Sequence, residues 1–443
     1  MPPGKAPVLK SSITLLRQLN VRALVLVVLL QIMWQPGLLW ASAVTDSLRL
    51  ELAGTRGAQH LQVQEKLVLH YWDAGDYDQC YLQAVQLRDL ARAWNFPVLE
   101  AEGWYHMARS VTRKGRENQA LEYHLEALKL RQHSNDALML MKSYHNIGVL
   151  FHKKEAYIPA RENYLLALGL ARMREQKDVI PTILRNLGLV SKELDAFKDA
   201  SAYYSEALAL ARAERDTSLE SVLINHIAVL QKEQGNYTEA LRYYESASSL
   251  ALLTGQQKCE AYCLNNIGQV YNLQREYGAA IRYLEKSLQL KSVLGDANVG
   301  GTLLNLGIAH SRLRESATAL KYLRQAQAIF KDEPTEDNIE VHRLLAEEYK
   351  RSGKVKAAIA AEQKADQLMT EYARIQRQHA LQMQAAAAQL ESIKMAMDNA
   401  SIRQKKAKTS GMITLFSGGV ALIVLITLFV RRLRKAQETT YNV

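Results

Sequence analysis

The chain has 443 residues, of which 48% are hydrophobic and only 8 are Pro, so it is long enough for a folded body with further segments. Its net charge of +11 is not spread evenly. The basic excess lies in residues 1–43 and 403–443, and the residues between them carry equal numbers of basic and acidic side chains. A neutral body offers no extended phosphate-binding face, so we do not expect a nucleic acid partner. Three cysteines are too few for a disulfide framework.

Residues 1–43 have the pattern of a secretory signal peptide. A basic stretch precedes an apolar run over residues 23–33, and residues 41–43 form a small-x-small cleavage motif. An uncleaved N-terminal anchor is the alternative. We favour cleavage because Pro36 interrupts the apolar stretch, which would need about 20 residues to span a bilayer. A short polar lead-in at residues 44–60 follows.

Residues 61–366 repeat one pattern eight times, with a step of 40 residues in the early copies and 39 in the last two. In every copy but the degenerate first, the first helix carries a small residue, at Ala108, Gly148, Gly188, Ala228, Gly268, Gly307 and Ala346. Twelve residues later the second helix carries another, at Ala120, Ala160, Ala200, Ala240, Ala280, Ala319 and Ala358. Small residues at this spacing let antiparallel helices approach closely, and apolar residues at i, i+3 and i+4 give each helix a stripe to bury. The pattern predicts an all-α superhelical solenoid of eight helix pairs, with Ala160, Ala200, Ala240 and Ala280 buried.

This pattern is similar to the tetratricopeptide repeat. That family places a bulky residue, Leu and a small residue on helix A, and Ala, an aromatic residue and Ala on helix B. Here Tyr164, Tyr204 and Tyr244 stand in the aromatic slot of helix B. The usual period is 34 residues, so the chain resembles the long-repeat branch of the family. The resemblance implies a right-handed superhelix whose concave surface binds a protein or peptide.

One polar row indicates where that surface lies. Four helix A copies carry Asn two residues before the small residue, at Asn146, Asn186, Asn266 and Asn305. In peptide-binding members of the family this slot faces the concave groove, where an amide can both donate to and accept from a peptide backbone. The resemblance therefore implies a groove with four more contacts nearby, at Arg109, His145, Arg185 and Gln269. The alternative is that the asparagines bridge adjacent helices inside the solenoid.

Residues 367–410 continue as helix after the repeats end. Apolar side chains recur there in steps of three and four, from Met369 through Met383 and Leu390 to Ala400. That seam favours a coiled-coil stalk that pairs two chains as a parallel homodimer. The alternative is a single amphipathic helix folded back on the last repeat.

The C-terminal end has the pattern of a membrane anchor. Residues 411–430 form a run of twenty without a charge, which predicts a transmembrane helix, and residues 431–443 form a basic tail. If the signal peptide exports the body, the tail stays in the cytoplasm. We therefore expect a single-pass protein of a bacterial inner membrane with its repeats in the periplasm.

No catalytic signature is found in the sequence. It contains no Walker loop, no HExxH and no GxSxG, so we expect neither an enzyme nor a cofactor. Cys80 takes a small-residue slot in the degenerate first copy, which favours a core role. Cys259 and Cys263 lie four residues apart, but no cluster of further ligands accompanies them, so we expect no metal site.

These features together resemble the sensor half of bacterial receptors that carry tetratricopeptide repeats, without the output domain. We expect a membrane-anchored scaffold or sensor that binds a protein or peptide on its concave face. The alternative is the input part of a signal-transduction receptor whose kinase or DNA-binding output is separate or truncated.

Overall fold

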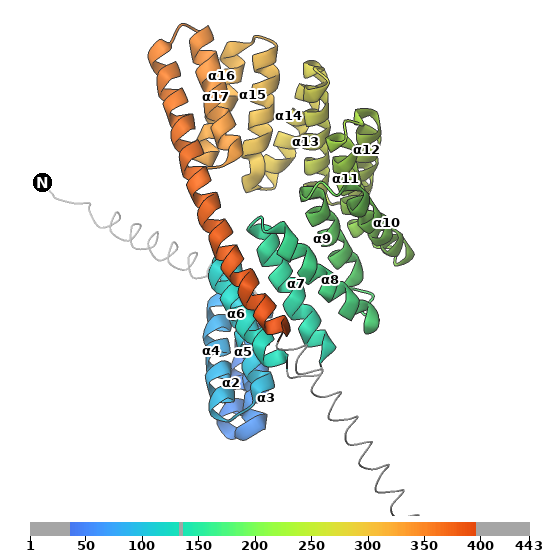
Figure 1. The fold of residues 1–443 in the computed structure, drawn as a ribbon, viewed down its shortest axis with the longest axis vertical. Coiled ribbons are helices and arrows are strands. Elements are labelled where there is room, and N and C mark those ends of the chain that lie inside the picture. Colours follow the sequence, from blue (N-terminus) through green and yellow to red (C-terminus); the bar gives the residue numbers. More distant parts are fainter. Residues whose placement is uncertain (1–35, 133–135, 396–443) are drawn as a thin grey trace, which may run out of the picture. The chain divides into compact units, whose positions relative to one another are not determined.

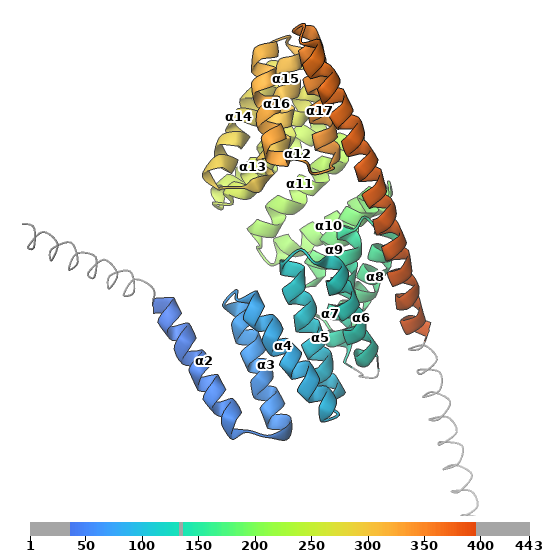
Figure 2. The same cartoon turned by 90° about the vertical axis from the view of Figure 1, so that its left-hand side faces the viewer.

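The computed structural model describes residues 36–132 and 136–395, and all regular structure in these two ranges is helical. The chain divides into two compact units between Ser134 and Asn135, and each unit is described by itself. Figures 1 and 2 show the helices in sequence order from two directions.

The first unit contains two repeat pairs behind an additional helix. Its helices are α2 (Pro36–Gly54), α3 (Gly57–Asp73), α4 (Tyr77–Ala93), α5 (Pro97–Arg113) and α6 (Glu117–Arg131). Residues 44–60, predicted as a polar lead-in, are largely helical, since α2 covers residues up to Gly54 and α3 begins at Gly57. Contacts with α3 stabilise α2. Thr45 Oγ1 lies 2.9 Å from His70 Nε2, and Arg49 donates to the Tyr71 hydroxyl at 3.0 Å. Most of the predicted signal peptide lies outside the described residues, while its cleavage motif at 41–43 falls within α2.

The second unit contains the remaining repeats. Its pairs are α7 (Ala137–Lys153) with α8 (Tyr157–Met173), α9 (Ile180–Glu193) with α10 (Phe197–Ala213), α11 (Thr217–Glu233) with α12 (Tyr237–Leu253), α13 (Gln257–Leu273) with α14 (Tyr277–Val293), α15 (Gly300–Arg312) with α16 (Ser316–Phe330), and α17 (Glu336–Arg351) with a long helix over residues 355–395. A short 3-10 helix, η1 (Ala297–Val299), precedes α15. The predicted succession of helix pairs is confirmed.

Small residues of helix A make room for a large side chain of the following helix B. A Cβ atom on Gly188 would collide with the Tyr204 ring, and one on Gly148 would lie 2.8 Å from the Tyr164 ring. Later repeats pair a glycine of helix A with a leucine instead, Gly268 with Leu284 and Gly307 with Leu323. The predicted burial is also confirmed, since the four alanines of helix B are fully buried: Ala160, Ala200, Ala240 and Ala280. Close helix contact therefore depends on both small slots.

The helices end in left-handed turns. In most of the described helices the residue that follows the cap has a positive φ, as at Gly235 (78°) and Gly255 (69°). Glycine adopts this conformation without steric penalty, but Glu155, Asp195 and Arg275 occupy equivalent turns with φ of 60°, 55° and 64°. The tight turns fix consecutive helices as antiparallel neighbours.

The helix over residues 355–395 is both the partner of α17 and an extension beyond it. Ala365 and Leu368 pack against Ile339 of α17. The same helix then reaches α8, where Lys394 Nζ lies 3.3 Å from the Glu162 carboxylate. The seam residues predicted to pair two chains are buried within one chain, namely Met383, Leu390 and Ile393. This arrangement is the alternative in which the helix folds back on its own chain, although the helix extends past the last repeat. The parallel homodimer stays a prediction.

The predicted membrane architecture requires correction. No helix within residues 36–132 and 136–395 has the length and apolar character needed to cross a membrane. The physical reason is that these helices are amphipathic, and their apolar stripes are used for contacts between helices. The predicted span 411–430 and tail 431–443 lie outside the described residues. Within residues 36–132 and 136–395 the fold is thus an all-α solenoid without a transmembrane helix, and the predicted location in an inner membrane with the repeats in the periplasm is not supported.

Candidate binding groove

The odd-numbered helices line the inner face of the second unit. Consecutive ones touch, α7 with α9, α9 with α11, α11 with α13, α13 with α15 and α15 with α17. No comparable contact joins consecutive even-numbered helices within residues 136–395. A row of helices that are closer together lies on the inside of a curved stack, so helix A of each repeat faces the concave side.

The asparagine row forms bonds between consecutive A helices on this face. Asn186 Nδ2 of α9 lies 3.3 Å from His145 Nε2 of α7. Asn266 donates to Asn225 Oδ1 at 3.2 Å, and Asn305 donates to Asn265 Oδ1 at 3.5 Å. These three asparagines therefore make the helix bridges that the alternative interpretation expected. Each amide can form more hydrogen bonds than the one used in its bridge, so bridging does not exclude contact with a ligand.

Asn146 differs from the other three. It hydrogen bonds to the neighbouring His145, whose pKa is lowered by burial despite that bond. The half-buried His145 thus connects Asn146 to Asn186 at one end of the row.

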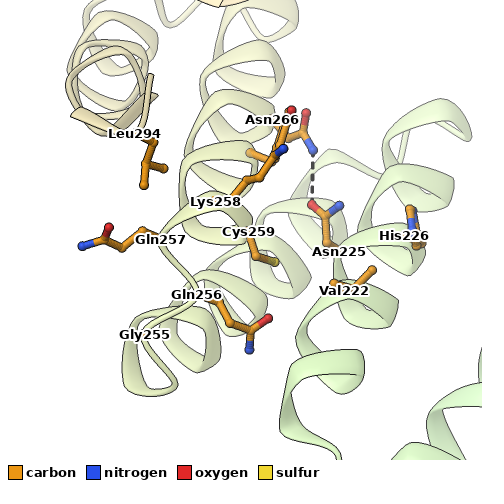
Figure 3. A pocket seen from close by; sticks show the side chains of 11 residues that line it. Val222, Asn225, His226, Gly255, Gln256, Gln257, Lys258, Cys259, Asn266 and Leu294 are labelled. Carbon is orange, nitrogen blue, oxygen red and sulfur yellow. Dashed lines mark hydrogen bonds between the residues drawn. The ribbon is translucent and has the colours of Figure 1, made fainter. Parts of the chain in front are cut away.

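A cavity of about 700 Å³ opens between the N-terminal halves of α11 and α13. Its walls are Val222 and Asn225 of α11, Cys259, Tyr262 and Asn266 of α13, and Leu294 after α14. Figure 3 shows the bond between Asn225 and Asn266 spanning from one helix to the other. Cys263 Sγ also lies 3.6 Å from Asn225 Oδ1. The cavity thus combines an apolar wall with a pair of fixed amides, which is the usual composition of a ligand pocket.

Cations lie along the same face. Arg185 of α9 is half-buried, and burial lowers its pKa. Within the described residues, its electrostatic partners are the Tyr164 and Tyr204 hydroxyls, with no carboxylate among them. Lys232 of α11 donates to Gln269 Oε1 at 3.2 Å, and burial lowers its pKa too. Arg185 is thus a partly desolvated cation without a carboxylate partner and favours an anionic ligand group, whereas Lys232 has the nearby Glu233 carboxylate.

The structure does not bring all the predicted contacts together. Seven of the eight lie on A helices of the second unit, namely Asn146, Asn186, Asn266, Asn305, His145, Arg185 and Gln269. Arg109 belongs to α5 of the first unit, where its guanidinium stacks 3.6 Å from the centre of the Trp72 ring. Such stacking is a cation–π contact and gives Arg109 a role within its own unit.

The cavity itself was not predicted from the sequence. Its lining comes from three separate parts of the sequence, within residues 222–226, within residues 255–266 and at Leu294, and none of these segments carries a ligand motif. The pair Cys259 and Cys263 was the available signal, because Cys259 lines the cavity and the sulfur of Cys263 lies 3.6 Å from Asn225 in its wall.

Comparison with known proteins agrees with this repeat architecture. Residues 218–292, from α11 to the end of α14, match the family model of the tetratricopeptide repeat. This match shows the tetratricopeptide repeat over these two helix pairs, and the helix pairs described above continue the same architecture on either side. A search of curated proteins finds no match.

Solved structures with the same fold include three that match over most of their own length. The apo form of RapI is 14% identical, with a TM-score of 0.51 over 73% of this chain and 98% of that one. Aspartyl phosphate phosphatase F from Bacillus subtilis is 13% identical, with a TM-score of 0.52 over 74% and 88%. A Rap protein complexed with competence and sporulation factor is 11% identical, with a TM-score of 0.50 over 75% and 93%. At these identities the likeness concerns the fold, and the predicted likeness to the sensor half of membrane receptors is not confirmed.

Proposed function

We propose that the second unit captures an extended segment of a partner protein along the inner face of its A helices. One apolar side chain of that segment enters the cavity between α11 and α13. The neighbouring backbone of the segment bonds to the amides of Asn225 and Asn266. The chain thus acts as a binding scaffold and not as a catalyst.

The cavity is the observation that supports this proposal most. At about 700 Å³ it is large enough for an aromatic or long aliphatic side chain, and it lies where the A helices already present polar atoms. Asn225 and Asn266 hold each other in position, which lowers the entropy lost when a ligand binds. Helix pairs of this kind position such side chains on rigid elements, so the groove is formed before the ligand arrives.

Arg185 supports an acidic group in the same ligand. It lies on α9, one repeat before the cavity, and is half-buried without a carboxylate partner in the described residues. A carboxylate of the ligand would supply that partner. The Rap protein mentioned above has the same repeat fold and was solved in complex with competence and sporulation factor.

The test is selection of peptides from a displayed random library on the full chain, followed by fluorescence polarisation with the enriched peptides. Val222→Trp fills the cavity and is expected to weaken binding at least tenfold. Ile329→Trp, at an exposed position of α16, is the matched control and should leave binding unchanged. Enrichment of no peptide, or equal binding by the Val222→Trp variant, would contradict the proposal.

A further inference from the structure

Cys259 occupies a position that the binding proposal does not use. It lies in the first turn of α13, is half-buried and lines the α11–α13 cavity. Its Sγ is 3.7 Å from Ser221 Oγ, and Cys263 follows one helical turn later. The three cysteines therefore differ in access, because Cys80 and Cys263 are fully buried.

The surroundings of Cys259 favour its thiolate. The hydrogen bond from Cys263 lowers the pKa of Cys259 to about 7, and the Ser221 hydroxyl acts in the same direction against the effect of burial. The pKa of Cys263 is raised, by that same bond and by burial, so Cys263 remains the protonated donor. Peptide N–H groups at the N-terminus of α13 also stabilise negative charge there.

We propose that Cys259 is a modification site, reached through the α11–α13 cavity, where small disulfide compounds form a mixed disulfide. The adduct and the peptide side chain of the proposed function need the same space, so only one can be present at a time. This consequence rests on the proposed function, whereas the modification itself does not.

The reaction is a thiol–disulfide exchange that needs no further reactant. The Cys259 thiolate attacks one sulfur of the small disulfide, a new S–S bond forms to Cys259, and the old S–S bond breaks. The other half leaves as a thiolate. One disulfide is consumed and one is formed, so the exchange is balanced in electrons.

The expected gain in rate follows from two opposing effects. At pH 7 about half of a thiol with a pKa of about 7 is ionised, against about 1% at the ordinary value of 9.0. The less basic thiolate is about eightfold less nucleophilic, so the net gain is about sixfold. Above pH 9 the advantage disappears, because an ordinary thiol is then largely ionised as well.

The first test follows release of nitrothiobenzoate when the full chain reacts with dithiobis(nitrobenzoate), an aromatic disulfide. One equivalent is expected to react fast, with a rate that rises around pH 7, and Cys259→Ser should remove this phase. Cys80→Ser is the matched control and should retain it. Cys263→Ala removes the donor and should shift the midpoint toward pH 9. A fast phase that survives in Cys259→Ser, or a midpoint near pH 9 in the native chain, would overturn the proposal.

The second test asks whether the thiol is reached through the cavity. Val222→Trp fills the cavity and should slow the fast phase at least tenfold, while Ile329→Trp should not. An unchanged rate in Val222→Trp would refute the cavity route. A library peptide, if one binds, should protect Cys259. If none binds, the proposed function fails, but the rates of these variants still decide the thiol site.

Discussion

Adding one methyl group at Gly188 tests how the repeats pack. In Gly188→Ala the new Cβ would collide with the ring of Tyr204, which is fully buried on α10. Neither helix can easily shift, because each is held by its neighbours on both sides. Overpacking of a dense core lowers the free energy of unfolding by about 1–3 kcal/mol. Replacing glycine by alanine in a helix raises it by at most about 1 kcal/mol.

Gly169 provides the matched control. It lies in the interior of α8, and an added Cβ would meet nothing within 4 Å. Gly169→Ala should therefore show only the gain in helix propensity, about 1 kcal/mol at most. The two alanine variants should differ by about 1–3 kcal/mol, with Gly188→Ala the less stable.

The assay is urea denaturation followed by circular dichroism at the helical signal, with the midpoints of both variants compared with the native chain. The midpoint of Gly188→Ala should fall and that of Gly169→Ala should rise or stay. If both variants moved together, close contact between helix A and helix B at the small slots would not explain the repeat pattern.

Three further predictions concern single side chains. His226 has a pKa lowered to about 4, chiefly by burial, so the folded state binds fewer protons than the unfolded state between pH 4 and 6.5. Stability should therefore decline as the pH falls through this window. His226→Asn introduces the residue that other repeats carry in this slot, so it should flatten the dependence of the urea midpoint on pH between pH 6.5 and 5. An equally steep dependence in the variant would contradict this. Arg275 has a φ of 64°, so Arg275→Gly should raise stability by up to about 1 kcal/mol in the same denaturation, and a loss would refute the turn argument. Leu390 is buried where the C-terminal helix has left α17, so Leu390→Ala should cost about 2–4 kcal/mol and speed hydrogen exchange over residues 380–395. Met395→Ala, at an exposed position, should change neither the stability nor the exchange rate. Equal exchange rates in the two variants would show that Leu390 makes no stabilising contact.

The repeat architecture was readable from the sequence because its determinants are local. The small slots at Gly188 and Ala200 recur at a fixed spacing, and each has a direct steric meaning. The helix α2 was missed, since its contacts through Thr45 and Arg49 depend on polar side chains that also suit a loop.

The C-terminal helix and the groove show why the remainder was not predictable. A seam such as Met383 and Leu390 is the same pattern whether it faces a second chain or is buried within its own chain. The row of asparagines was visible, but its partners were not, because Asn225 and Asn266 become neighbours only when two repeats stack. The cavity between them requires the curvature of the stack, which no single repeat specifies.

The most direct test of the central claim is hydrogen exchange of the full chain with and without a peptide selected from the library. Binding in the cavity should slow exchange in the N-terminal halves of α11 and α13, including residues 219–222 and 258–262, and leave α12 and α14 unchanged. Protection confined to the even-numbered helices, or no protection in α11 and α13 at a saturating peptide concentration, would contradict a binding site on the inner face.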